Sequence, residues 1–160
     1  MNESMLWIVG AGVALVLVAA AVTALRRKTP PLGGPWPVYA KRLLGEREQV
    51  LYWRLVAAFP KHVVLAQVSL SQLLGVQKGT TNRQAVANRF RQLCADFVIC
   101  DRSFTTVGVV ELDGLSHDHP RRAEADLRKA QALQAAGLPI VRINVADLPD
   151  EAVLRAMIPI

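Results

Sequence analysis

The 160-residue chain has few cysteines and lacks the motifs of several large enzyme classes. Its two cysteines, Cys94 and Cys100, form no C-x-x-C pair, and no third or fourth thiol is present to complete a zinc site. They lie too far apart along one predicted strand for a disulfide, so we interpret both as small core residues in a reducing compartment. The chain also has no phosphate-cradling glycine loop, no dinucleotide fingerprint and no Ser-His-Asp order, which argues against kinases, dehydrogenases and serine hydrolases.

Charged residues are absent from residues 5–25, which are almost entirely apolar. As a helix this run would span roughly 31 Å, close to the hydrocarbon thickness of a bilayer, and it has no polar face. Glu3 is the only charged residue before it, whereas Arg26, Arg27 and Lys28 follow it directly. We therefore predict a single transmembrane helix in the bacterial inner membrane, within an anchor of residues 1–28, with the C-terminal part in the cytoplasm.

A cleavable signal peptide is the alternative interpretation of this segment. Small residues around positions 19–21 and 22–24 could imitate a cleavage site. The first four residues contain no lysine or arginine, however, and the apolar run is longer than the hydrophobic region of most signal peptides. Both observations favour the anchor.

Proline and glycine are concentrated directly after the anchor, where residues 29–37 read TPPLGGPWP. This composition predicts a semi-extended linker over residues 29–44 and one folded domain over residues 45–160. The formal net charge of the whole chain is +6, part of which comes from the bases beside the anchor. The remaining mildly basic charge is compatible with nucleic-acid binding without being diagnostic of it.

Periodicity predicts that helices and strands alternate in this domain. Helical spacing marks residues 46–59, a short segment at 69–75, residues 81–93, residues 120–136 and residues 148–157. Strands rich in β-branched residues are expected at 62–69, 95–100, 106–112 and 138–144. The pattern predicts an α/β or α+β fold with a mixed sheet, in which one hairpin supplies an antiparallel pair.

Acidic residues are placed unusually in that hairpin. If it turns about Ser103 and Phe104, Asp96 lies directly opposite Glu111, and two such carboxylates repel each other. Asp113 lies two residues further along the same strand and adds a third carboxylate to its face. Such a group suits a hard cation such as Mg²⁺. Alternatively, the register differs and the acids are paired with arginines or solvated.

The order of motifs resembles that of a nuclease superfamily. DFVICD, a turn, VELDGLSH, a charged helix and AAGLPIVRI together are similar to the PD-(D/E)xK, or restriction-endonuclease-like, superfamily. The similarity covers residues 46–142 and is strongest to an uncharacterised bacterial family allied to the very short patch repair endonucleases. It implies a restriction-endonuclease-like core preceded by the transmembrane helix.

The resemblance also implies roles for individual residues. Asp96 matches the superfamily's metal-binding aspartate, Glu111 its second acidic residue, and Glu48 the glutamate of the leading helix. Asp113 stands where most members have a lysine, so an E-x-K site is incomplete here. The mismatch-repair branch also lacks this lysine and uses a histidine, which His117 would match.

The implied activity is Mg²⁺- or Mn²⁺-dependent hydrolysis of phosphodiester bonds in DNA or RNA, by a membrane-anchored endonuclease. A metal at Asp96, Glu111 and Glu48 would polarise the scissile phosphate, and His117 could act as general acid or base. Basic residues expected to contact phosphates are Arg121, Arg122, Arg128, Lys129 and Arg142.

Structural interpretations compete with these roles. His117 and His119 can cap the helix that follows, Glu48 suits the first turn of a helix, and Asp126 can pair with Arg122. The whole domain can instead be an inactive descendant of the fold that binds nucleic acid or a protein partner at the inner membrane. A structural or assembly factor on the same scaffold is a third hypothesis.

Overall fold

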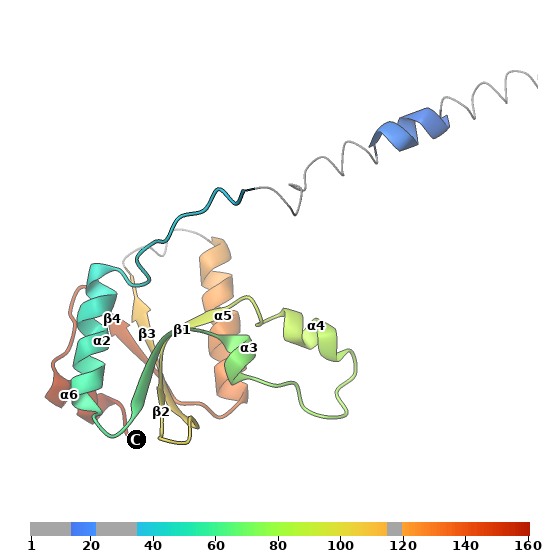
Figure 1. Ribbon diagram of the computed structural model, residues 1–160. Helices are drawn as coiled ribbons and strands as arrows, with labels where there is room; N and C mark the ends of the chain where they lie inside the picture. The colour runs from blue at the N-terminus through green and yellow to red at the C-terminus, as the bar shows by residue number, and fades with distance from the viewer. Residues whose placement is uncertain (1–13, 22–34, 115–119) are drawn as a thin grey trace, which may run out of the picture. The chain divides into compact units, whose positions relative to one another are not determined.

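The computed structural model describes residues 14–21, 35–114 and 120–160, with only the backbone of residues 120–122 (Figure 1). The chain divides into two compact units, residues 1–41 and 42–160. In the first unit, the described residues comprise a helix over 14–21 and a segment over 35–41 without regular secondary structure. Trp36, Val38 and Tyr39 in that segment are exposed to solvent.

The prediction of a transmembrane helix over residues 5–25 is wrong for the part of the chain that the structure describes. There, no helix is long and apolar enough to cross a membrane. The helical residues described in this region run only from 14 to 21. Eight residues of α-helix rise about 12 Å, whereas the hydrocarbon core is about 30 Å thick. The remainder of the predicted segment lies outside the described residues.

The second unit contains a four-stranded mixed sheet, which is compatible with the predicted α/β class. The strands are β1 (Val63–Ser69), β2 (Cys94–Cys100), β3 (Thr106–Asp113) and β4 (Ile140–Asn144), and they lie in the order β1-β2-β3-β4. β1, β2 and β3 form an antiparallel meander, and β4 pairs in parallel with β3. The parallel connection runs through α5 (Pro120–Ala135), as parallel pairs require a crossover.

Helices cover both faces of the sheet (Figure 1). On one face, α2 (Glu46–Ala58) and α6 (Glu151–Met157) pack against the sheet, with Leu51, Leu55 and Leu154 fully buried. On the other face, α5 and the short α3 (Leu70–Leu73) bury Leu133 and Leu70. The sheet is therefore the middle of three layers, and its central strands are buried on both sides.

Local signals account for three of the helix ends. α2 ends at Ala58, two residues before Pro60, whose ring cannot continue a helix. α5 ends at Ala135, and Gly137 follows at φ +70°, the left-handed conformation that closes many helices. α6 begins after Asp150, whose side chain accepts a 2.9 Å hydrogen bond from the amide of Val153.

Two local predictions in this unit are wrong. The helix expected over residues 81–93 is confined to α4 (Arg83–Asn88), because the chain beyond it must turn into β2. The carbonyl of Leu93 accepts a 2.8 Å hydrogen bond from the amide of Leu70, which ties this segment to the end of β1 instead of to a helix. Cys94 is exposed and is not a core residue, whereas Cys100 is buried as expected.

Candidate functional site

The predicted register of the β2–β3 hairpin is confirmed. Val98 pairs with Val109, and Phe97 pairs with Val110. Continuing this register by one residue places Asp96 across from Glu111, with Asp96 near the start of β2 and Glu111 near the end of β3. Antiparallel neighbours bring these two ends together, so the two acidic residues share one end of the sheet.

Asp96 is held by the backbone of the neighbouring strand. Its Oδ2 accepts a 2.8 Å hydrogen bond from the amide of Leu112, which fixes the carboxylate between the two strands. The side chain is partly buried. Its position is therefore set by the hairpin itself and requires no other element.

Glu111 is the only charged or polar residue in the buried core of the described part of the chain. It shares the sheet face of Val109, two residues earlier, which is the face that α5 covers. Lys129, on α5, donates a hydrogen bond from Nζ to Oε2 of Glu111 and forms an ion pair with it. The exposed fractions of the two side chains are only 7% for Glu111 and 15% for Lys129. A buried acid and a partly buried base therefore compensate each other.

The pKa of Glu111 is raised from its ordinary value of 4.5 to about 7. Burial is the main cause, because it removes the charged carboxylate from water. The Lys129 ammonium opposes the shift, whereas the nearby carboxylate of Asp96 adds to it. Oε1 of Glu111 is buried and has no hydrogen-bond partner among the described residues. One lone-pair-bearing oxygen is thus left for a further donor or a cation.

A strained residue of β1 lies at the same end of the sheet. Ala66 pairs with Phe97 and Val68 with Ala95, and Gln67 between them adopts φ +53° across from Asp96. A left-handed conformation is uncommon for a residue other than glycine and is concentrated at functional sites.

The amide of Gln67 connects this point to α2. Its Nε2 donates a 3.1 Å hydrogen bond to Oε1 of Glu48. Oε2 of Glu48 accepts a 2.5 Å hydrogen bond from the amide of Gly45, at the start of α2. Glu48 therefore caps its own helix, as the structural interpretation predicts, and also lies at the end of the sheet that carries the acid pair.

Asp113 and Arg142 form a peripheral pair. Asp113 Oδ1 lies 3.7 Å from Arg142 Nη1, and the register pairs Glu111 with Arg142 across β3 and β4. Both side chains are more than a third exposed. For Asp113, the structure therefore shows the alternative interpretation, in which an acid pairs with an arginine. Arg142, which was expected to contact phosphate, has this acid as its partner.

The remaining predicted residues have no described side chains or no described role at this site. His117 lies outside the described residues, and the side chains of Arg121 and Arg122 lie outside them too. On α5, the described i,i+4 contact is between Glu124 and Arg128, at 4.0 Å. The assigned roles of these residues stay predictions.

For two residues of the site, the sequence did not predict the observed contacts. Lys129 was expected to contact phosphate, and its pairing with Glu111 depends on how α5 packs on the sheet. Gln67 carried no signal, because glutamine inside a β-rich run predicts an ordinary strand residue. The register of β1 with β2 is the same on both sides of Gln67, so no inserted residue marks the position, and the left-handed conformation has no local sequence signature.

A metal-ion centre of three ligands is not formed by the described residues. Among residues 14–21, 35–114 and 120–160, no group of three or more His, Cys, Asp or Glu side chains is placed to hold a metal ion. Asp96 and Glu111 remain as a pair of carboxylates. Mg²⁺ usually retains several waters and binds through one or two carboxylates, so this pair and the unpartnered Oε1 of Glu111 fit such an ion.

Comparisons with known proteins assign no activity to this arrangement. No curated protein and no solved structure matches the chain. The model of one family, described as "Protein of unknown function (DUF2726)", matches residues 40–160, which is more than half of the chain and includes every described residue of the site. The chain therefore belongs to the DUF2726 family.

Proposed function

We propose that residues 42–160 form a metal-dependent nuclease domain that hydrolyses phosphodiester bonds of DNA or RNA. The observation that carries the proposal is the group Asp96, Glu111 and Lys129 at one end of the sheet. It contains two adjacent acids, one of them buried, and one base. The resemblance to the PD-(D/E)xK superfamily supports the same conclusion.

The stability of the fold does not explain why Asp96, Glu111 and Lys129 lie together. Burying an ion pair is no more stabilising than burying apolar residues of the same volume, and it is often less so. Two neighbouring carboxylates add repulsion, which contributes to the raised pKa of Glu111. Strongly perturbed acids with a specific charged partner are concentrated at functional sites.

The three side chains have complementary chemical roles. The backbone amide of Leu112 orients Asp96, and Glu111 anchors the ammonium of Lys129 beside the acid pair. A fixed positive charge there can stabilise the negative charge that develops on phosphoryl oxygens during hydrolysis. Lys129 would thereby supply, from a helix, the lysine that is missing at Asp113.

Asp96 and Glu111 would hold the metal ion. Mg²⁺ or Mn²⁺, when bound, supplies a Lewis acid that polarises a phosphoryl oxygen. A cation beside Glu111 also favours the ionised carboxylate, so metal binding should be coupled to release of a proton near neutral pH.

An inactive module that binds nucleic acid is the second candidate function. It is favoured by the ion pair itself, because the ammonium of Lys129 already neutralises Oε2 of Glu111. In that case the pair is structural, and metal ions should neither bind there nor matter for nucleic-acid affinity.

Metal binding and cleavage measured on the same samples test the proposal. The full chain and its Glu111→Gln, Asp96→Asn and Lys129→Met variants are titrated with Mn²⁺ by calorimetry. Each is then incubated with plasmid DNA, with single-stranded DNA and with RNA in Mg²⁺ or Mn²⁺. Glu124→Gln, an exposed acid on α5, serves as the matched control.

We expect the wild type and Glu124→Gln to bind Mn²⁺ and to cleave at least one substrate. Asp96→Asn and Glu111→Gln should lose both properties, whereas Lys129→Met should bind Mn²⁺ and cleave at least 100-fold more slowly, the size of loss typical for removal of one electrostatic catalytic group. A folded wild type that neither binds Mn²⁺ nor cleaves any of the substrates would overturn the nuclease proposal.

A further inference from the structure

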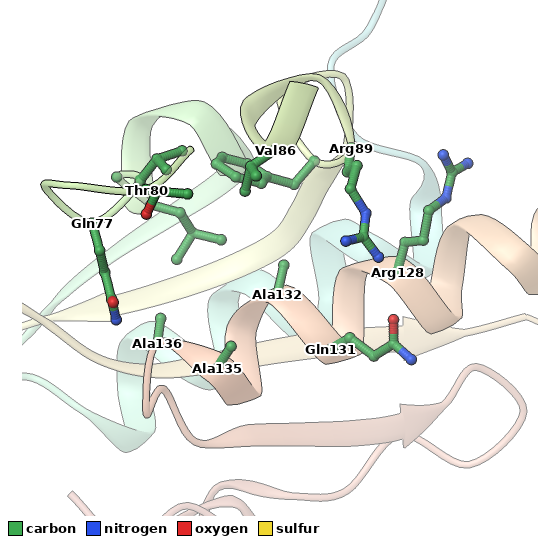
Figure 2. Close-up of a pocket in the computed structure, with 13 residues that line it drawn as sticks. Gln77, Thr80, Val86, Arg89, Arg128, Gln131, Ala132, Ala135 and Ala136 are labelled. Carbon is green, nitrogen blue, oxygen red and sulfur yellow. The ribbon is translucent and has the colours of Figure 1, made fainter. Parts of the chain in front are cut away.

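A cavity lies between α5 and the segment that connects α3 to α4 (Figure 2). Its volume is about 350 Å³. Ligand pockets in proteins span about 300 to 1,000 Å³, so this one suits a single small unit and is too small for a duplex. The small side chains of Ala132 and Ala135 on α5, and of Ala136 directly after it, form one wall, and residues of α4 and of the loops beside it form the other.

The two ends of the cavity differ in chemistry. Figure 2 shows Arg89, at the end of α4, and Arg128, on α5, side by side at one end. Gln77 and Thr80 lie at the other end and offer amide and hydroxyl groups. Leucine, valine and phenylalanine side chains line the region between, including Phe90.

The arginine end is suited to an anion. Arg89 has no ion-pair partner in the described part of the chain, and Nε of Arg128 is buried there without a hydrogen-bond partner. The acid nearest to Arg128, Glu124, is 4.0 Å away and largely exposed. A phosphate bound by both arginines would supply the anionic partner that Arg89 lacks, and a guanidinium group can donate bidentate hydrogen bonds to it.

We propose that this cavity holds one nucleotide of a single-stranded nucleic acid. Its phosphate lies between Arg89 and Arg128, and its base enters the apolar part against Phe90. Amide and hydroxyl groups at the far end can read the polar edge of a base, whereas an acyl chain would leave them unpaired. Unpaired bases are commonly bound by such a combination of apolar or aromatic contacts and arginine.

The cavity and the acid pair share α5. Arg128 lines the cavity, and Lys129, the next residue, pairs with Glu111 on the sheet side of the helix. A strand whose nucleotide occupies the cavity would therefore contact the same helix that contributes Lys129 to the acid pair. The choice of nucleic acid as ligand rests on the proposed function. The size of the cavity adds that the bound nucleic acid is single-stranded.

Binding without metal tests this inference separately from cleavage. Fluorescence anisotropy is measured for the full chain in EDTA, with a labelled eight-nucleotide thymidine strand. A second probe of the same length has abasic sites, so it keeps the phosphates and lacks the bases. The variants are Ala135→Phe, which fills the cavity from an exposed helix position, and Arg89→Gln, with Arg91→Gln as the control for an exposed arginine nearby.

The wild type should bind the thymidine strand at least tenfold more tightly than the abasic strand. Ala135→Phe should abolish that difference and leave abasic binding unchanged, Arg89→Gln should weaken both probes, and Arg91→Gln should stay within twofold of wild type. Ala135→Leu repeats the test with a smaller side chain if the phenylalanine variant does not fold.

Equal affinity of the wild type for the two probes, or unchanged base-dependent binding in the cavity-filling variant, would overturn the inference. The two proposals can fail separately. If the cavity variants change nucleotide binding as expected but neither the wild type nor any variant cleaves nucleic acid, the nucleotide site is supported and the nuclease proposal fails.

Discussion

Lys129, on α5, and Glu111, on β3, form a largely buried ion pair although they are 18 positions apart in the chain. The pair links the helix that covers one face of the sheet to the strand that carries the acidic hairpin. The ammonium also lowers the pKa of Glu111, against the larger opposing effect of burial. The stability and the chemistry of this region should therefore both respond to either residue.

Replacing Lys129 by methionine should destabilise the domain by about 3 kcal/mol at pH 8, because it leaves a charge on Glu111 buried without its partner. The loss should be smaller at pH 5, where Glu111 is protonated. Urea unfolding at the two pH values measures both effects. Lys78→Met, at an exposed loop position, is the control and should change stability by less than about 0.5 kcal/mol. Equal losses at both pH values would contradict this account of the pair.

Glu111 should make the wild type less stable as the pH rises from 4.5 to above 7. In this window the folded protein holds a proton that the unfolded chain releases, so the free energy of unfolding falls with pH. Glu111→Gln cannot titrate and should lack this contribution, which amounts to about 3 kcal/mol over the whole window. Chemical denaturation from pH 4 to pH 8 compares the two proteins. Parallel curves for the two would show that Glu111 titrates normally in the folded state.

At Gln67, glycine should be more stable than alanine by about 1 kcal/mol, because only glycine adopts a positive φ without strain. Both substitutions remove the hydrogen bond to Glu48, so their difference isolates the backbone effect. Thermal unfolding of the two variants gives this difference. The same pair of substitutions at Gln72, in α3, should give the opposite order, because glycine disfavours helices. An alanine variant at Gln67 as stable as the glycine variant would argue against a strained site.

The turn of the β2–β3 hairpin should depend on the Asp101 carboxylate. Asp101 Oδ1 accepts hydrogen bonds from Ser103 N and Oγ at 2.8 and 2.7 Å, and from Thr105 N at 2.9 Å. These bonds hold its pKa below the ordinary 3.8, the hydrogen bond from the Ser103 side chain most of all. The stabilisation is present above that value and is lost as the pH falls through the lowered pKa.

Asp101→Ala should therefore lower the thermal midpoint at pH 7, and the deficit should shrink when the pH falls well below 3.8. Asp101→Asn keeps an acceptor oxygen and should lose less than the alanine variant. A deficit that is the same at acidic and neutral pH would mean that the charge of Asp101 does not contribute to the turn.

Local patterns predicted a large part of the fold. The alternation of strands and helices, the prolines and glycines that end α2 and α5, and the register of the β2–β3 hairpin all follow from neighbouring residues. The opposition of Asp96 and Glu111 was predictable for the same reason. A two-residue period and a short turn fix which side chains face each other.

The apolar composition of residues 5–25 predicted a membrane-spanning helix, whereas no described helix is long and apolar enough to cross a membrane. Two other predictions failed where the position of a residue in the sheet is decisive. The pattern of residues 81–93 favoured a helix, but the chain there is committed to a hydrogen bond with Leu70 and to the start of β2. Cys94 was expected in the core because it belongs to a strand, and its place near the sheet end leaves it exposed.

The sequence by itself determined which acids the hairpin brings together, because strand pairing within a hairpin is a short-range property. Only the tertiary structure decided what surrounds them. The packing of α5 on the sheet selects Lys129 as the partner of Glu111, and the hydrogen bond from the left-handed Gln67 to Glu48 connects α2 to the same end. These relationships depend on how helices pack across the sheet, and such long-range packing leaves no periodic signal in the chain.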